Sequence, residues 1–357
     1  MPELNRISIS LLDSYHYKAF AIAIHRVLAT DLALETYSQI IDGLPLSKVA
    51  WDRYSGRLDR RHPISLHTKL CTEAFEVAKS MRDQLDMRVF SFEPKVSIQN
   101  QLTPSDLKVN RPIQLLQLFQ SATPRSRRFQ LRLLELVAVT LHQIAIYLFQ
   151  NGPRLHDRHC SYSQDPENNS HIDAITSWKP PPSRWPGKEP WPTLFAHPAF
   201  TAHEQYPAGV ADMVGYWAED RILGGVALFD RSKTWDDEIE EPNVYFQSSR
   251  PKRTYQIYQL TDKQQQELLR FLSLRLDHDS SSRRGDEEDN FCPLPISFSH
   301  GENDNLVDPE FAVVRSKIYR DPWERPPPRP YQQFIRERDV VIGQAEEELK
   351  RLRRLGL

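Results

Sequence analysis

The segment 205–231 constrains the fold more than any other part of the chain, because it holds four of the twelve glycines among apolar runs. Residues 210–218 and 222–230 are two runs rich in Val, Ile, Tyr, Trp and Phe, with three charged residues between them. Runs of this length and composition predict two β-strands joined by a tight turn. Apolar side chains fall on both faces of the first run, so we expect this hairpin to lie centrally in a sheet. The pair Gly224 and Gly225 predicts a β-bulge or the close approach of another backbone.

The sequence after this hairpin predicts the rest of a small sheet. Residues 244–247 and 254–260 are two more strand-like runs, which follow an acidic loop. A helix then begins at Thr261, where Gln264 completes a capping box. We therefore predict an α+β fold, in which a helical N-terminal part joins an antiparallel β-sheet of about four strands packed by a helix.

The residues of the hairpin also carry a resemblance to a protein family. From Tyr206 to Arg231 the chain reads Y-P-x-G-x-A-D, then G-Y-W-A-E, then G-G-V-x-L-F-D-R, and the similarity continues at 244–246 and 258–260. This signature resembles one shared by uncharacterised proteins of filamentous fungi. The resemblance implies a fungal source and adds no activity, cofactor or catalytic residue.

The composition of successive segments divides the chain into five parts. Residues 1–150 are predicted to be mostly helical, residues 151–195 form a Pro- and Trp-rich connecting strap, and residues 196–276 form the unit of sheet and helix. Residues 277–310 predict a disordered acidic and polar loop. Residues 311–357 predict a Pro-rich segment followed by an amphipathic C-terminal helix. The 27 prolines favour stiff, extended connections between these parts.

Within the N-terminal part, the apolar periodicity predicts several separate elements. We expect helices at about 14–42, 66–85, 112–119 and 129–149, and a strand pair at 87–98.

Charge and cysteine content exclude several classes of protein. The formal net charge is -2, so no bias of the whole chain favours nucleic acid or an anionic membrane as a partner. Cys71, Cys160 and Cys292 lie far apart, which predicts free thiols in a reducing compartment. The most apolar stretch, 133–149, contains Glu135 and is shorter than the roughly 20 residues of a membrane span. We expect a cytoplasmic or nuclear protein without a signal peptide or a transmembrane segment.

Two short clusters were weighed as ligand sites. His156, His159 and Cys160 have side chains that bind zinc, but zinc sites take four ligands, usually from two separated pairs, and the sequence offers one pair. We predict a polar loop there, with no metal and no cofactor. Arg125 to Arg128 precede a predicted helix and could bind a phosphate or an acidic partner; a solvated loop is the favoured interpretation.

Candidate binding residues gather in the predicted hairpin and at its ends. They are Tyr206, Asp212, Tyr216, Trp217, Glu219, Asp230 and Arg231. Asp212 stands in an otherwise apolar run, so its carboxylate must be paired, hydrogen-bonded or protonated. With Tyr206 and His203 nearby in sequence, it could take part in acid–base chemistry. Alternatively, Asp212 caps backbone amides or holds Arg221 or Arg231.

No motif in the sequence decides between these functions. The dinucleotide-binding, phosphate-loop, nucleophile-elbow and HExxH patterns are all absent from it. We favour a non-enzymatic interaction or scaffold protein that binds another protein through its C-terminal helix or its Trp/Pro-rich segment. The alternative is an enzyme, for example of fungal secondary metabolism, that uses acidic and tyrosine residues around 205–231. An enzyme should enclose Asp212 or Glu219 in a pocket, whereas a binding protein should expose an apolar patch.

Overall fold

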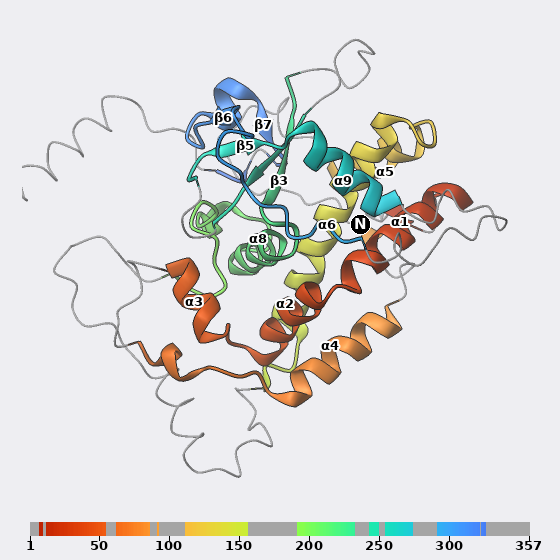
Figure 1. Ribbon diagram of the computed structural model, residues 1–357. Coiled ribbons are helices and arrows are strands. Elements are labelled where there is room, and N and C mark those ends of the chain that lie inside the picture. Colours follow the sequence, from red (N-terminus) through yellow and green to blue (C-terminus); the bar gives the residue numbers. More distant parts are fainter. Residues whose placement is uncertain are drawn as a thin grey trace, which may run out of the picture. The chain divides into compact units, whose positions relative to one another are not determined.

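The computed structural model describes residues 7–9, 12–54, 62–85, 91–92, 111–155, 191–232, 243–249, 254–273, 291–321 and 323–325. All but the last of these residues belong to one compact unit, Met1–Glu324. This unit combines helices with an antiparallel β-sheet, so the predicted α+β class is confirmed (Figure 1). The histidine cluster at 156–160, most of the Trp/Pro-rich segment, residues 277–290 and the predicted C-terminal helix lie outside the described residues.

The predicted hairpin is wrong in its secondary structure. Val210–Leu223 form helix α8, and Val226–Asp230 form a single strand, β3. The charged triplet that was expected to be a turn lies in the last turns of α8. Helix α8 contacts α2, α6 and β3, and 12 of its 14 residues are buried. Its apolar residues therefore lie all around the helix. A helix that is buried all round has no single apolar stripe and so does not show the usual helical period.

The segment is buried, as predicted, both in the helix and in the strand. In β3, Val226 and Leu228 belong to one hydrophobic cluster, while Ala227 and Phe229 belong to another. The predicted close approach of another backbone occurs at Gly224, where a Cβ atom would lie 2.0 Å from the carbonyl oxygen of Ile296. Gly224 ends α8 with φ of 103°, a left-handed conformation that glycine adopts readily.

The sheet has five strands in the order β6-β5-β4-β3-β7, and every neighbouring pair is antiparallel. The predicted strands appear as β4 (Val244–Gln247) and β5 (Ile257–Gln259). Two strands that the sequence did not indicate complete the edges, namely β6 (Leu306–Val307) and β7 (Ile318–Tyr319). Each is only two residues long, which gives too few side chains for a periodic signal.

Helix α9 (Asp262–Ser273) begins where the capping box predicted. The backbone N–H of Gln264 donates to Oγ1 of Thr261 at 3.2 Å, and the N–H of Thr261 donates to Oε1 of Gln264 at 3.1 Å. These reciprocal bonds satisfy two N–H groups at the helix start.

The N-terminal part contains the helices α1 (Ser14–Leu28), α2 (Asp31–Asp42), α3 (Ser47–Tyr54), α4 (Thr72–Gln84), α5 (Arg111–Gln120) and α6 (Arg127–Asn151). The single helix expected over 14–42 is therefore wrong, because Thr30 interrupts it and caps α2 through the N–H of Ala33. The helix expected over 66–85 begins only at Thr72, after a 3-10 turn at Pro63–Leu66.

Of the strand pair expected over 87–98, the described residues contain one strand, β2 (Ser91–Phe92). It pairs with β1 (Ile7–Ser8) in a small separate sheet.

Helix α6 is the principal helix of the core. Among the described residues it alone is long and apolar enough to cross a membrane, and 83% of its most apolar window is buried inside the protein. Its buried residues include the charged or ionisable Arg132, Glu135 and His142. Such groups require partners when they are withdrawn from water, and their partners define the candidate site.

Candidate functional site

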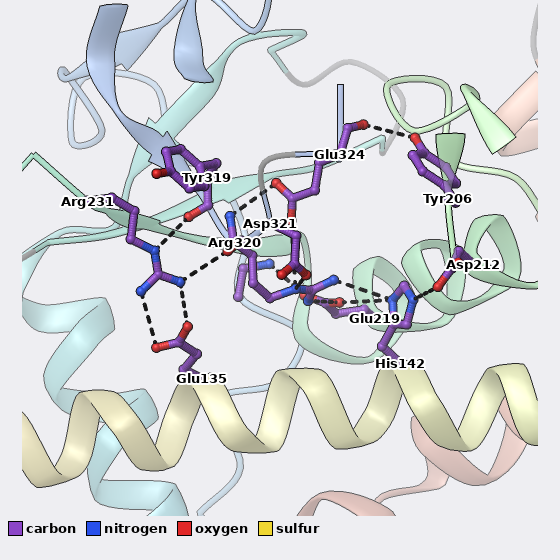
Figure 2. A network of polar contacts seen from close by, with 11 residues as sticks. Glu135, His142, Tyr206, Asp212, Glu219, Arg231, Tyr319, Arg320, Asp321 and Glu324 are labelled. Carbon is purple, nitrogen blue, oxygen red and sulfur yellow. Dashed lines mark hydrogen bonds and ion pairs between the residues drawn. The ribbon is translucent and has the colours of Figure 1, made fainter. Parts of the chain in front are cut away.

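Charged side chains from several parts of the chain meet in the interior of the unit, between α6, α8 and the sheet (Figure 2). They come from α6, from α8, from the residue after β3 and from the residues that include and follow the end of β7. We call this set the buried ionic network. Its members are Glu135, His142, Tyr206, Asp212, Glu219, Arg231, Tyr319, Arg320, Asp321 and Glu324.

Arg320 occupies the centre of the network, and its side chain is 3% exposed. Its Nη1 donates a hydrogen bond to Oε2 of Glu219 at 2.5 Å, and its Nη2 lies 3.4 Å from Nδ1 of His142. Its Nε lies 3.6 Å from the carboxylate of Asp321 and 3.7 Å from that of Glu324. One guanidinium thus contacts groups from two helices and from its own segment.

Glu219 is fully buried and accepts hydrogen bonds on both carboxylate oxygens. The first, Oε1, accepts from the backbone N–H of Ala227 in β3 at 2.7 Å, while the second accepts from Arg320. Burial alone would raise the pKa of Glu219, but the charge of Arg320 holds that pKa below its ordinary value. Burial would likewise lower the pKa of Arg320, but the Glu219 carboxylate raises that pKa well above its ordinary value. Both groups are therefore ionised at neutral pH.

His142 and Asp212 form the second pair of the network. Nε2 of His142 donates to Oδ1 of Asp212 at 3.0 Å, and Nδ1 lies 3.4 Å from Nη2 of Arg320 and 3.8 Å from Oε2 of Glu219. The other oxygen of Asp212, Oδ2, accepts from the backbone N–H of Ala208 at 2.5 Å, just before α8. Capping of a backbone amide is one of the two structural roles that the sequence suggested for Asp212.

Gly215 and Tyr216 fit α8 closely to this histidine. A Cβ atom on Gly215 would lie 2.6 Å from ring atoms of His142, so only glycine allows the two helices to approach this far. The Tyr216 ring packs edge to face against the imidazole, with 4.5 Å between ring centroids. The same ring lies 5.3 Å from Cζ of Arg320, within the range of a cation–π contact.

Arg231 continues the network toward the N-terminal end of α6. Both of its terminal nitrogens donate to the carboxylate of Glu135, and its Nε donates to the carbonyl oxygen of Tyr319 at 3.2 Å. Arg132 also donates to Glu135, at 2.9 Å. Burial lowers the pKa of Arg132 to about 10, because the attraction of Glu135 offsets the desolvation only in part and Arg231 repels it. The carboxylate of Glu135 thus pairs with two arginines, Arg132 and Arg231.

Residues 318–321, 323 and 324, which we call the closing segment, receive further hydrogen bonds from the residues before α8. The hydroxyl of Tyr206 donates to the carbonyl oxygen of Glu324 at 2.9 Å, and Nε2 of Gln205 donates to that of Trp323 at 2.7 Å. Within the segment, the N–H of Arg320 donates to Oε2 of Glu324 at 3.1 Å. The ion pairs of Arg320 and the hydrogen bonds from Gln205 and Tyr206 to the backbone therefore hold the closing segment in place.

The seven candidate residues chosen from the sequence have different positions. The network includes Tyr206, Asp212, Glu219 and Arg231, and Tyr216 packs against it. Trp217 instead contacts Phe195 in the hydrophobic core, and Asp230 accepts a hydrogen bond from the N–H of Ser232. The histidine that joins Asp212 is His142 rather than His203.

Sequence reasoning missed Arg320, Glu324, Glu135 and His142 as members of the site. Two of them carried a signal, since Glu135 and His142 interrupt an apolar helix and buried ionisable groups require partners. Arg320 lies in a short polar stretch with no local pattern, and its partner Glu219 is 101 residues away in the chain.

The geometry of the network fits a structural role better than a catalytic one. A general base must be reached by the group from which it takes a proton, but Asp212 is 3% exposed and His142 is 5% exposed. The second ring nitrogen of His142, Nδ1, lies between Nη2 of Arg320 at 3.4 Å and Oε2 of Glu219 at 3.8 Å. Within the described part of the chain, no group of three or more His, Cys, Asp or Glu side chains is arranged to hold a metal ion.

The arginine cluster before α6 has a structural role in part. Ser126 caps this helix by accepting from the N–H of Phe129 at 3.1 Å, and Arg127 donates to the Gln265 side chain of α9. The phosphate or acidic partner that this cluster suggested stays a prediction.

Comparison with protein-family models, with curated proteins and with solved structures gives no match to this chain.

Proposed function

We propose that this is a non-enzymatic interaction or scaffold protein of the cytoplasm or nucleus, whose buried ionic network holds the closing segment on the body of the protein. The observation that carries the proposal is the pair of Arg320 and Glu219, with side chains that are 3% and 0% exposed. The surrounding groups of the chain already bind both charges. Because the ionised groups of such a site are bound to one another, they stabilise the fold and do not contact a substrate.

The closing segment is the point from which the chain continues into residues 325–357. In the sequence, this continuation is Pro-rich and then amphipathic, with an apolar seam at Ile342, Ala345, Leu349 and Leu352. A fixed starting point reduces the entropy that a binding segment loses on association. We therefore propose that the partner is another protein, bound through this seam or through the Trp/Pro-rich segment. The fungal source implied by the resemblance stays a prediction.

Purification of the full chain with its partners from the native host tests this proposal. In one variant Leu349 and Leu352 are replaced by Glu, which removes the apolar seam. The matched control replaces Gln332 and Gln333 by Glu, which changes the net charge equally outside the seam. We expect a stoichiometric protein partner with wild type and control that is lost with the seam variant. A partner that the seam variant still binds would indicate that the interface is in the Trp/Pro-rich segment. Failure to find any protein partner would contradict the proposal.

A second candidate, an enzyme of fungal secondary metabolism, rests on the hydrogen bond of 3.0 Å between His142 and Asp212 beside Tyr206 and Tyr216. A histidine oriented by a carboxylate is a common general base. For this function the closing segment has to open and Arg320 has to leave Nδ1 of His142. The Asp212→Asn variant described in the Discussion separates the two candidates, because catalytic residues are often held at the expense of stability.

A further inference from the structure

The groups around Arg320 are arranged for a planar cation and not only for a positive charge (Figure 2). Glu219 accepts at one edge of the guanidinium plane, and Nδ1 of His142 lies 3.4 Å from another edge nitrogen. The Tyr216 ring is 5.3 Å from the central carbon. A guanidinium presents donors in a fixed planar fork and stacks on aromatic rings, whereas an ammonium is a compact point charge.

Asp212 contributes to this arrangement through His142. Its Oδ1 lies 3.0 Å from Nε2 of His142, and this bond orients the imidazole with Nδ1 3.4 Å from Nη2 of Arg320. Asp212 is thus a positioning residue for the imidazole. Three carboxylates lie within 4 Å of the Arg320 side chain, on Glu219, Asp321 and Glu324, so the surroundings are acidic without Arg320 itself.

The arginine that fills this position comes from a minimal element of the sheet. It directly follows β7, which has two residues and pairs only with β3 at the edge of the five-stranded sheet. The recognising groups on α6 and α8, in contrast, belong to long buried helices. The groups that bind the guanidinium therefore lie on long helices, whereas the arginine itself follows a strand of two residues.

We infer that this is a guanidinium-binding site, which the chain fills with its own Arg320 and which accepts a guanidinium group from another molecule when that side chain is absent. The ligand class is an alkylguanidinium, and the natural example is an arginine side chain. This inference does not depend on the proposed scaffold function, because it concerns only what the surrounding groups recognise.

The test is chemical rescue of the full-length Arg320→Ala variant. Truncation removes the cation and keeps the acceptors and the tyrosine ring in the chain, so that an alkylguanidinium can take the position of the lost side chain. Ethylguanidinium chloride at about 10 mM is compared with ethylammonium chloride at the same concentration, so that ionic strength is equal. We expect ethylguanidinium to raise the melting midpoint of the variant by several degrees more than ethylammonium does.

Two controls keep the result specific. Wild type has an occupied site, so its midpoint should respond equally to the two salts. Arg221→Ala removes an arginine that also pairs with a glutamate and stacks on a ring of α8, but at a more open position. Equal responses of Arg320→Ala to both salts, or an equal rescue of Arg221→Ala, would overturn the inference. If Arg320→Ala does not fold in buffer, the soluble yield on refolding is measured instead; a several-fold higher yield with ethylguanidinium supports the site, and equal yields refute it.

Discussion

Two arginine sites on helix α8 use the same kinds of group and differ in burial. At the inner site, Arg320 pairs with Glu219 and lies over the ring of Tyr216. At the outer site, Arg221 pairs with Glu35 at 3.2 Å and lies over the ring of Trp217. The inner side chains are 3% and 0% exposed, whereas the outer ones are 12% and 39% exposed.

This difference shows how burial changes the requirements on an ion pair. Water screens the outer pair, and exposed pairs typically contribute about 0–1 kcal/mol. At the inner site each charge has lost its hydration, so the network supplies further acceptors and donors in its place. The inner site therefore includes His142, Asp212 and Glu324, while at the outer site Nε of Arg221 lies 3.4 Å from the hydroxyl of Thr36.

Removal of the carboxylate should give the largest difference in stability loss between the two sites. We expect Glu219→Gln to lower the free energy of unfolding by about 3–5 kcal/mol, because both partners of this carboxylate are donors and an amide can accept from only one of them. The matched Glu35→Gln should cost about 0–1 kcal/mol. Urea titrations of the two variants measure both values, and similar losses would show that burial does not distinguish the sites.

Asp212→Asn should have the next largest effect. Its two oxygens accept from His142 and from the N–H of Ala208, so an amide again leaves a donor facing a donor. We expect a loss of about 1.5–3 kcal/mol in thermal or denaturant melts at neutral pH. A melting temperature at or above that of wild type would favour the enzymatic candidate, in which the carboxylate is kept for chemistry.

Gly215→Ala tests whether the inner site depends on the close approach of α6 and α8. Alanine usually stabilises a helix interior relative to glycine, by up to about 1 kcal/mol. Here the new Cβ would meet the ring of His142 at 2.6 Å, so we expect a net destabilisation of about 1–3 kcal/mol. Neutral or increased stability in denaturant melts would mean that the imidazole can shift without loss.

The dependence of stability on pH should be the smallest of these differences. Because the folded-state pKa of Glu219 lies below its ordinary value, ionised Glu219 contributes stability above the unfolded-state pKa, which is about 4.3 for a glutamate. That contribution is lost as the pH falls through the folded-state pKa. The gap in unfolding free energy between wild type and Glu219→Gln should therefore narrow as the pH falls below about 4. A gap that stays constant from neutral pH down to pH 3 would show that folding does not lower the pKa of Glu219.

The contrast between α9 and α8 explains how much of the fold could be predicted. Helix α9 rests one face on the core, so its leucines form a stripe, and Thr261 and Gln264 mark its start. Helix α8 has 12 of its 14 residues buried, so its apolar residues do not form a single stripe, and a short apolar run of this kind does not distinguish a helix from a strand. The burial of the segment followed from its composition, but its secondary structure did not.

The site was predictable only in part. Asp212 interrupts an apolar run and Glu219 stands at the end of a predicted strand, and both are in the network. Their partners could not be inferred, because His142 lies 70 residues and Arg320 lies 101 residues away along the chain. Contacts between such distant residues arise from tertiary packing and leave no local spacing to read.

The coupling free energy between Arg320 and Glu219 tests most directly the claim that this network is a structural clamp. It is obtained from the unfolding free energies of wild type, Arg320→Met, Glu219→Gln and the double variant. The account predicts a coupling above about 1.5 kcal/mol for this pair, and below about 1 kcal/mol for the corresponding cycle of Arg221→Met and Glu35→Gln. A coupling at the inner site no larger than that at the outer site would contradict the account.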